Sequence, residues 1–221
     1  RRASASRQPR AEELNAAAAY AYKSAGAKVY GPQYELVMEV LTGSRNSIAH
    51  LGCGVGKSGG WILPLMHSSM ISQVAISFML VSPYKALVNQ HAQQARESFE
   101  GTPLTVRTLT TAECESVTLN DLQANLIVVS VAGLLRLRTH HEELLKQSPI
   151  KVCFVDEVHN VAQELFRVET WSALKNLASL GWKLYLLTAT TNNFLSKCLS
   201  DYIGKHDQFN IIGHSGEGYR I

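Results

Sequence analysis

The sequence predicts one α/β domain, built on a doubly wound, mostly parallel sheet with helices on both faces. Short runs that are apolar at nearly every position recur along the chain, as expected for strands that are buried on both faces. Segments with apolar residues at helical spacing separate several of these runs. The 221 residues, of which 46% are hydrophobic, suffice for one large domain, and no internal repeat is visible.

Two helices are expected before the first strand. Residues 11–25 are rich in alanine, carry two glutamates in the first turn, and are followed by Gly26. Residues 32–43 begin with a proline and place their leucines and valines on one helical face. The preceding residues 1–10 contain four arginines and no large apolar residue, so we expect a disordered basic arm there.

Six strand-like runs follow these helices. They are residues 47–51, 74–81, 104–108, 125–130, 151–155 and 183–188. Helical spacing of apolar residues appears at 61–66, 88–99, 171–178 and 195–202. This alternation favours a parallel sheet, because parallel neighbours must be joined by long crossover connections, which are usually helices.

Composition argues against several classes of protein. The chain has no run of about 18 apolar residues, which a membrane-spanning helix would need, and no visible signal peptide. Its four cysteines lack C-x-x-C spacing, so we expect neither zinc in this segment nor a disulfide framework, and we expect a reducing, intracellular compartment. The net charge of +3 permits a polyanionic partner without requiring one.

The segment LGCGVGKS, residues 51–58, nearly spells the phosphate-binding loop G-x-x-x-x-G-K-[ST]. It lies between a predicted strand and a predicted helix, where backbone N–H groups and a helix N-terminus can bind phosphate. Lys57 would contact the β- and γ-phosphates of ATP, and the Ser58 hydroxyl would bind Mg²⁺. The remaining cradle residues are Gly52, Cys53, Gly54, Val55 and Gly56. Because Leu51 replaces the first glycine, this motif alone leaves an incidental glycine-rich turn as an equal alternative.

Two carboxylates follow the apolar strand at residues 151–155. Asp156, at the carboxyl end of a parallel strand, can supply the anionic ligand that Mg²⁺ on ATP needs. Glu157 is then placed to orient or deprotonate the attacking water. An Asp-Glu pair on the surface is the alternative, but its occurrence in the same chain as a GKS loop favours the nucleotide site.

In this order, the motifs resemble the first RecA-like lobe of superfamily-two helicases, and most closely the RecQ group. The phosphate loop of these helicases often reads M-P-T-G-x-G-K-S, so an apolar residue at Leu51 fits, with Gly52 and Cys53 in place of proline and threonine. The resemblance implies a RecA-like lobe over residues 11–213. It also implies a 3′–5′ DNA helicase that uses Mg-ATP to move on single-stranded or forked DNA, in recombination and repair.

The resemblance assigns further site residues. Gln33 matches a glutamine that recognises adenine in RecQ proteins, although the Phe-Arg that usually precedes it is not clearly present. VSPYKALVNQ, residues 81–90, resembles motif Ia. There Ser82, Pro83 and Lys85 would contact the nucleic acid.

LLTATT, residues 186–191, resembles motif III. In the family, Thr188, Ala189 and Thr190 would couple ATP hydrolysis to strand binding. His159, the last residue of DEVH, would link that loop to the catalytic carboxylates.

The segment after DEVH departs from the RecQ pattern. RecQ proteins carry an aromatic-rich loop there that senses single strands by stacking and charge. This chain has a shortened version, in which Phe166 and Arg167 remain as candidate contacts to nucleic acid. Whether DNA still stimulates ATP turnover is therefore open.

Other functions also remain open. A DEAD-box-like RNA helicase or a double-strand translocase would have a similar first lobe. A degenerate, non-catalytic lobe that binds only a nucleic acid or a partner would explain the shortened loop, but not the intact phosphate-loop and DEVH residues. A generic P-loop kinase would not explain the resemblance to motifs Ia and III. We expect a second RecA-like lobe in the full-length protein, after a linker that starts at 214–221, and a nuclear location if the protein is eukaryotic.

Overall fold

The computed structural model describes residues 8–29, 31–52, 54, 56–72, 75–163, 167–189 and 209–213. A seven-stranded sheet in the order β3-β4-β2-β5-β6-β1-β7 lies at the centre, and all neighbouring strands are parallel. The strands are β1 (Ser47–His50), β2 (Phe78–Ser82), β3 (Val106–Leu109), β4 (Leu126–Ser130), β5 (Val152–Val155), β6 (Lys183–Thr188) and β7 (Asn210–Ile212).

All six predicted strands are present, with ends that differ by a few residues. β2, for example, begins at Phe78 rather than at residue 74. β7 was not predicted; it pairs with β1, where Asn210 lies opposite Ser47. Its three residues are too few for an apolar pattern to distinguish a strand from a loop.

Helices connect most of the strands. They are α1 (Ala11–Ala21), α2 (Gly31–Thr42), α3 (Gly59–His67), α4 (Lys85–Ser98), α5 (Val131–Gln147), α6 (Val158–Gln163) and α7 (Arg167–Ser179). Residues 1–7 of the predicted arm and the predicted helix at 195–202 lie outside the described residues. Arg10, at the end of the predicted arm, caps α1, because its backbone N–H donates to Glu13 Oε2 at 2.9 Å.

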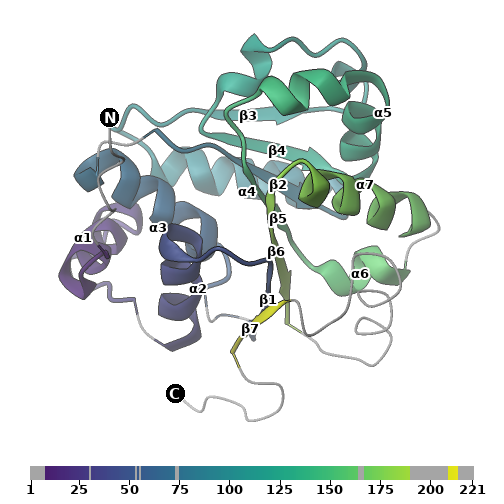
Figure 1. Ribbon diagram of the computed structural model, residues 1–221. Helices are drawn as coiled ribbons and strands as arrows, with labels where there is room; N and C mark the ends of the chain where they lie inside the picture. The colour runs from purple at the N-terminus through teal and green to yellow at the C-terminus, as the bar shows by residue number, and fades with distance from the viewer. Residues whose placement is uncertain are drawn as a thin grey trace, which may run out of the picture.

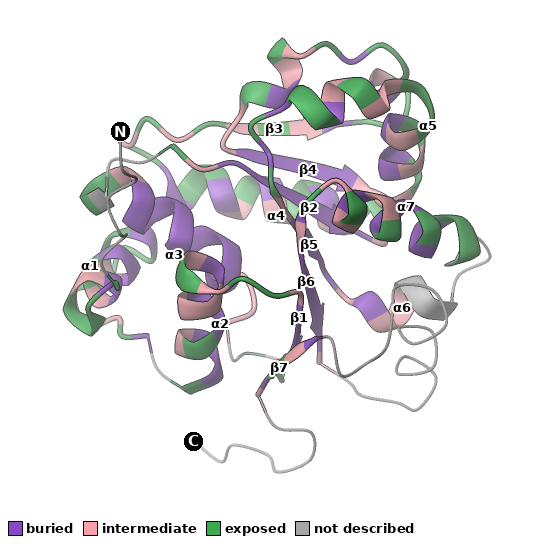
Figure 2. Cartoon of the chain, viewed as in Figure 1, coloured by how far each residue is buried: buried purple, intermediate pink, exposed green. Residues whose placement is uncertain are grey.

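The helices cover both faces of the sheet, so the predicted doubly wound fold is confirmed (Figure 1). α1 to α4 pack against one face, and α5 and α7 pack against the other. Along β2, Phe78 and Leu80 belong to the first core. Met79 and Val81 alternate with them and belong to the second. Figure 2 shows the buried strands between the two layers of helices.

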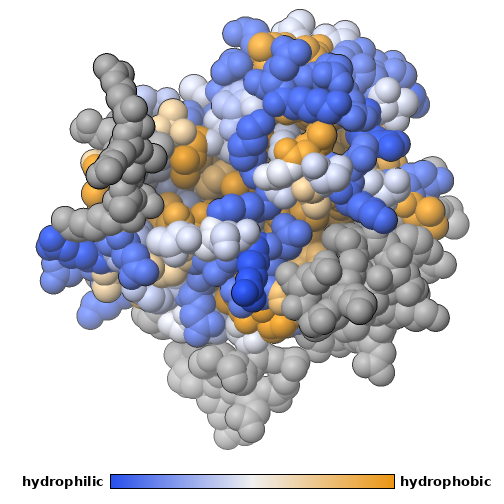
Figure 3. Space-filling model, in the orientation of Figure 1, coloured by the Kyte–Doolittle hydropathy of each residue, from blue (hydrophilic) through white to orange (hydrophobic). Residues whose placement is uncertain are grey.

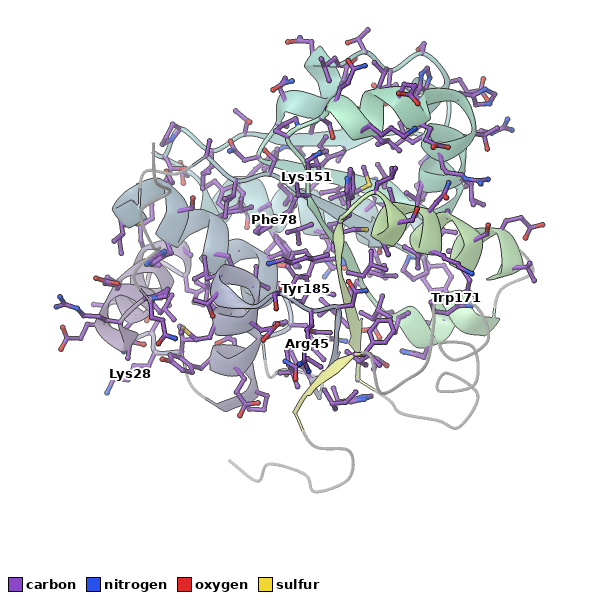
Figure 4. All side chains as sticks on the ribbon, in the orientation of Figure 1. Lys28, Arg45, Phe78, Lys151, Trp171 and Tyr185 are labelled. Atoms are coloured by element: carbon purple, nitrogen blue, oxygen red, sulfur yellow. The ribbon has the colours of Figure 1, made fainter. Side chains whose placement is uncertain are left out.

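Aromatic rings join three neighbouring strands on the face covered by α1 to α4. The rings of Phe78 and Phe154 lie 5.4 Å apart edge to face, and those of Phe154 and Tyr185 stack at 5.1 Å. Figure 4 labels Phe78 and Tyr185 within this layer. Each such pair contributes about 0.5–1.5 kcal/mol beyond the burial of its area, so these contacts hold β2, β5 and β6 in register.

The outer surface is polar over α5, on the side of the sheet opposite α1 to α4. Figure 3 shows mostly hydrophilic residues over α5. This helix buries Leu134, Leu137 and Leu145 and exposes Arg136, Glu143 and Lys146. No helix within the described ranges is long and apolar enough to cross a membrane.

The parallel arrangement determines where polar loops meet. β5, β6 and β1 are consecutive in the sheet, so the loops that follow their carboxyl ends emerge side by side at one edge. These loops carry DEVH, the TAT segment and LGCGVGKS, respectively. The fold therefore gathers at one edge three motifs that the sequence separates widely.

Candidate functional site

The phosphate-loop candidate joins β1 to α3 through a sharply turned backbone. Gly54 and Gly56 have φ values of +81° and +85°, in the left-handed region that glycine adopts without steric cost. The backbone N–H of Leu51 donates to the Thr188 carbonyl at 2.9 Å and anchors the start of the loop on β6. Cys53 and Val55 lie outside the described residues, and Gly52 is exposed.

Gln33 packs against this loop from α2. Its amide nitrogen donates to the Gly56 carbonyl at 2.9 Å and lies 3.5 Å from the Tyr22 hydroxyl. A Cβ added at Gly56 or Gly59 would overlap that amide nitrogen, so a larger residue at either position would displace the Gln33 amide. The structure thus places Gln33 beside the nucleotide-site candidate. A glutamine that contacts adenine would have to lie there.

Lys57 forms an ion pair with Glu157, in which its ammonium contacts Oε1. Both side chains are half-buried, with 16% and 23% of their surface exposed. Glu157 has a φ of +46°, a left-handed conformation that is uncommon for a residue with a side chain and is found often at functional sites. The pair joins the end of the phosphate loop to the DEVH segment.

Asp156 is buried beside this pair, and its backbone N–H donates to the Val81 carbonyl at 2.9 Å. Its Oδ2 lies 2.8 Å from His91 Nε2. Burial raises the pKa of Asp156, but the hydrogen bond and charge interaction with His91 and the charge of Lys57 lower it more, so the net pKa is below its usual value. The group is therefore an ionised carboxylate at neutral pH.

Mg²⁺ fits the oxygen atoms at this position. Asp156 Oδ1 is buried and accepts no hydrogen bond from the residues that the structure describes. The Ser58 hydroxyl lies in the same site and accepts a hydrogen bond from Gln94 Nε2 at 3.0 Å. Carboxylate and hydroxyl oxygens are ligands that Mg²⁺ accepts, usually together with phosphate and water oxygens. Within the described ranges, no cluster of three or more His, Cys, Asp or Glu side chains forms a separate metal site.

DEVH is connected to the TAT segment by a hydrogen bond. His159 Nδ1 lies 3.0 Å from Thr188 Oγ1 and 3.4 Å from Glu157 Oε2. Thr188 is fully buried at the end of β6, and Ala189 follows it, half-buried. Thr190 lies outside the described residues. One histidine therefore contacts both the candidate catalytic carboxylate and the segment that resembles motif III.

The nucleic-acid candidates of motif Ia divide into buried and exposed residues. Ser82 is fully buried at the end of β2, and its contact with the nucleic acid stays a prediction. Pro83 is half-buried, whereas Lys85 is exposed at the start of α4. Phe166 and the Arg167 side chain lie outside the described residues, although α7 begins at Arg167.

Lys85 borders a cavity of about 280 Å³ at the carboxyl ends of β3 and β4. Its polar lining consists of Lys85, Asn89, Thr108, Thr110, Thr111 and Ser130. A positive charge among amide and hydroxyl groups suits the phosphate and sugar oxygens of a nucleic acid backbone.

Four site residues were not identified from the sequence. Tyr22 lies near Gln33, Trp61 packs on His91, and His91 and Gln94 contact the candidate metal ligands. The spacing of His91 and Gln94 on one face of α4 was the available signal. That signal is weak, because polar residues at this spacing usually indicate only an exposed helix face.

Comparisons with known proteins agree with this geometry. Residues 30–197 match the family described as DEAD/DEAH box helicase. No curated protein is detectably related to the chain.

Solved helicase structures share the fold at low sequence identity. The DUF1998 helicase MrfA bound to DNA has a TM-score of 0.73 and 17% identity, over 92% of this chain and 30% of that chain. Dbp5 of S. cerevisiae, bound to RNA and ADP BeF3, has a TM-score of 0.69 and 19% identity, over 95% of this chain and 51% of that chain. Mss116p bound to ssRNA and AMP-PNP has a TM-score of 0.68 and 14% identity, over 95% of this chain and 46% of that chain. The chain thus spans about a third to a half of the helicases it matches.

Proposed function

The chain belongs to the DEAD/DEAH box helicase family, and we propose that it is the ATP-binding lobe of a RecQ-like 3′–5′ DNA helicase. The lobe binds and hydrolyses Mg-ATP, and a second RecA-like lobe completes the motor that moves along single-stranded DNA. The observation that carries this proposal is the ion pair of Lys57 with Glu157, 100 positions apart. It joins the phosphate loop to the carboxylates that the reaction requires.

ATP hydrolysis needs a cation at the phosphates and a carboxylate near the attacking water. Lys57 fills the first role, since it belongs to the phosphate loop and contacts Glu157. Glu157 fills the second and orients or deprotonates the water. Gln33, hydrogen-bonded to the loop, recognises the adenine. The remaining loop residues, Gly52 to Gly56, cradle the phosphates with their backbone N–H groups.

Ser58 and Asp156 hold Mg²⁺ in this proposal. When bound, the ion neutralises charge that develops on the phosphate oxygens. The buried Oδ1 of Asp156, for which the described residues provide no hydrogen-bond partner, supports this assignment. A buried carboxylate oxygen without a partner is costly unless a ligand or water satisfies it.

Nucleic acid would bind at the motif Ia end of α4. Lys85 and the polar cavity beside it support this placement. The hydrogen bond between His159 and Thr188 supports a role of DEVH and the TAT segment, including Ala189 and Thr190, in coupling hydrolysis to strand binding. Phe166 and Arg167 remain proposed contacts from the shortened loop.

RNA is the alternative substrate. Structures bound to DNA and structures bound to RNA resemble the lobe almost equally, which supports keeping both possibilities. We propose DNA on the RecQ-like pattern around Gln33. A helicase of this kind would act inside the cell, in the nucleus of a eukaryote, and residues 11–213 would form its first lobe.

The test is a titration of the 221-residue chain with a fluorescent ATP analogue and Mg²⁺. Lys57→Ala should lose binding by about tenfold or more, because an ionic hydrogen bond contributes about 1.5–3 kcal/mol. Lys151→Ala is the matched control, since Lys151 is an exposed lysine at the opposite end of β5 from Asp156. Equal binding by all three proteins would contradict the assignment of Lys57.

The same titration with and without nucleic acid distinguishes the substrates. Single-stranded DNA and single-stranded RNA of one sequence are compared for their effect on nucleotide affinity and on ATP turnover. A larger effect of RNA than of DNA would contradict the DNA proposal and favour an RNA helicase. Nucleotide binding with no response to either strand, also after fusion to a second RecA-like lobe, would favour a non-coupled lobe.

A further inference from the structure

Two polar side chains on α4 contact the two residues that would hold Mg²⁺. His91 Nε2 lies 2.8 Å from Asp156 Oδ2, and Gln94 Nε2 donates to Ser58 Oγ at 3.0 Å. His91 and Gln94 are three positions apart, so they lie on the same face of the helix, one above the other. One helix thus reaches both ends of the proposed metal site.

The His91 ring is held on more than one side. Its ring and that of Trp61 meet edge to face, with centroids 5.9 Å apart and planes at 78°. Trp61 is itself fully buried in α3, directly after the phosphate loop. The His91 side chain is 13% exposed and that of Asp156 is 9% exposed. A buried hydrogen bond between two packed side chains has a well-defined geometry, because little rotamer freedom remains.

α4 is also fixed on the sheet. Val88, Ala92 and Ala95 are buried in the core that α1 to α4 share. These residues recur at helical spacing and form the apolar stripe of α4. His91 and Gln94 flank this stripe, so the packing of the helix determines where their polar atoms lie.

The direction of the hydrogen bonds leaves free the atoms that a metal needs. An ionised carboxylate can only accept, so His91 donates to Oδ2 of Asp156. The other oxygen, Oδ1, is buried and has no hydrogen-bond partner among the described residues. At Ser58, the Gln94 amide occupies one lone pair of the hydroxyl and leaves the other lone pair available.

We propose that His91 and Gln94 are positioning residues that hold Asp156 and Ser58 in the orientation that binds Mg²⁺ with the nucleotide. The inference rests on the proposed function, in that it takes Ser58 and Asp156 as the metal ligands. Neither residue touches the metal. Hydrogen bonds of this kind to metal ligands typically contribute 10- to 100-fold to metal affinity.

The test measures the Mg²⁺ dependence of nucleotide binding rather than turnover. The thermal unfolding midpoint of the 221-residue chain is recorded with a non-hydrolysable ATP analogue at fixed millimolar concentration, across a series of Mg²⁺ concentrations and in EDTA. A bound ligand raises the midpoint according to its affinity, so weak binding is also detected. The EDTA series gives the baseline for each variant.

Three substitutions separate the hydrogen bonds from the packing. His91→Phe keeps a ring against Trp61 and removes the N–H, whereas His91→Gln keeps an amide donor near the position of Nε2. Gln94→Met removes the donor to Ser58 with little change in shape. We expect His91→Phe to need about tenfold more Mg²⁺ than the wild type to reach half of the midpoint shift. Gln94→Met should also need more Mg²⁺, but by a smaller factor. His91→Gln should restore most of the wild-type response.

Each outcome has a distinct meaning. If His91→Phe responds to Mg²⁺ like the wild type, the positioning role is refuted. An equal loss with and without Mg²⁺ also refutes it, because this result indicates only structural packing. If the wild-type chain shows no midpoint shift with nucleotide under any condition, the proposed function itself fails and this inference fails with it. If the nucleotide shifts the midpoint in EDTA and Mg²⁺ does not increase this shift, the chain still binds nucleotide. The assignment of Ser58 and Asp156 as metal ligands is then refuted, and the positioning role with it.

Discussion

The ammonium of Lys57 lies against the carboxylate of Glu157, so the residue assigned to the phosphates is paired with the residue assigned to the attacking water. For Lys57 to contact the phosphates of ATP, this pair must open or be shared. Glu157 is therefore a competitor for the lysine as well as the proposed base. Removing its charge should affect binding and hydrolysis in opposite directions.

Glu157→Gln should bind the nucleotide about two- to fivefold more tightly, which corresponds to the roughly 0.5–1 kcal/mol of a partly exposed ion pair. Its rate of phosphate release should fall by about 10²-fold or more, because the proposed general base is lost. Fluorescence titration and single-turnover kinetics measure the two effects. Glu169→Gln, an exposed change on α7, is the control, and weaker binding by Glu157→Gln would contradict the competition.

Gly56→Ala and Gly54→Ala should differ in base selectivity. Both positions have φ near +80°, so each alanine costs about 1–2 kcal/mol of backbone strain. The added Cβ has open space at Gly54 but overlaps the Gln33 amide at Gly56. We expect Gly56→Ala to lose the preference for ATP over GTP, and Gly54→Ala to keep it. Competition titrations measure the ratio, and equal selectivity in both variants would argue against adenine recognition by Gln33.

A double-mutant cycle tests the contact between His159 and Thr188. Thr188→Val removes the hydroxyl and His159→Ala removes the ring, while the 3.0 Å hydrogen bond needs both. We expect a coupling energy of about 0.5–1.5 kcal/mol in nucleic-acid-stimulated ATP turnover. Basal turnover without nucleic acid should show less coupling. If the two effects simply add under both conditions, the bond does not link DEVH to strand binding.

Lys85→Ala should weaken the binding of single-stranded nucleic acid regardless of its sequence. One lost phosphate contact also lowers the slope of log affinity against log salt by about 0.7–1. Fluorescence anisotropy at several salt concentrations gives both quantities. Lys151→Ala should leave the slope unchanged, because Lys151 lies at the amino end of β5. A similar loss in both variants would indicate only a general effect of charge.

Two cysteines should resist alkylation in the folded chain. Burial raises the pKa of the Cys114 thiol to about 11 and that of Cys153 to about 12. The reactive thiolate therefore forms in the native state only at a pH well above about 8.5, the pKa of an unperturbed cysteine thiol. Labelling with iodoacetamide at pH 8, read for each peptide by mass spectrometry, should be at least about tenfold slower than in the unfolded chain. Equal rates would contradict the burial of these thiols.

The sequence determined the layout of the fold because its signals are local. Apolar runs such as residues 151–155 predicted strands, and helices between them predicted parallel pairing, as observed. The roles proposed for Lys57 and Asp156 also came from the sequence, since phosphate and metal sites require particular residue types at the ends of strands. β7 was missed because three residues carry too little pattern.

The tertiary structure alone decided which polar atoms meet. Ser82 follows the motif Ia pattern, yet the end of β2 buries it, whereas Lys85, three residues later, is exposed. His91 lies 65 positions from Asp156, and nothing in α4 by itself distinguishes it from an exposed polar residue. Its contact with Asp156 depends on how the apolar stripe of α4 packs on the sheet, because that packing turns one helical face toward the loop after β5. Such contacts are set by the whole core and not by any short segment of sequence.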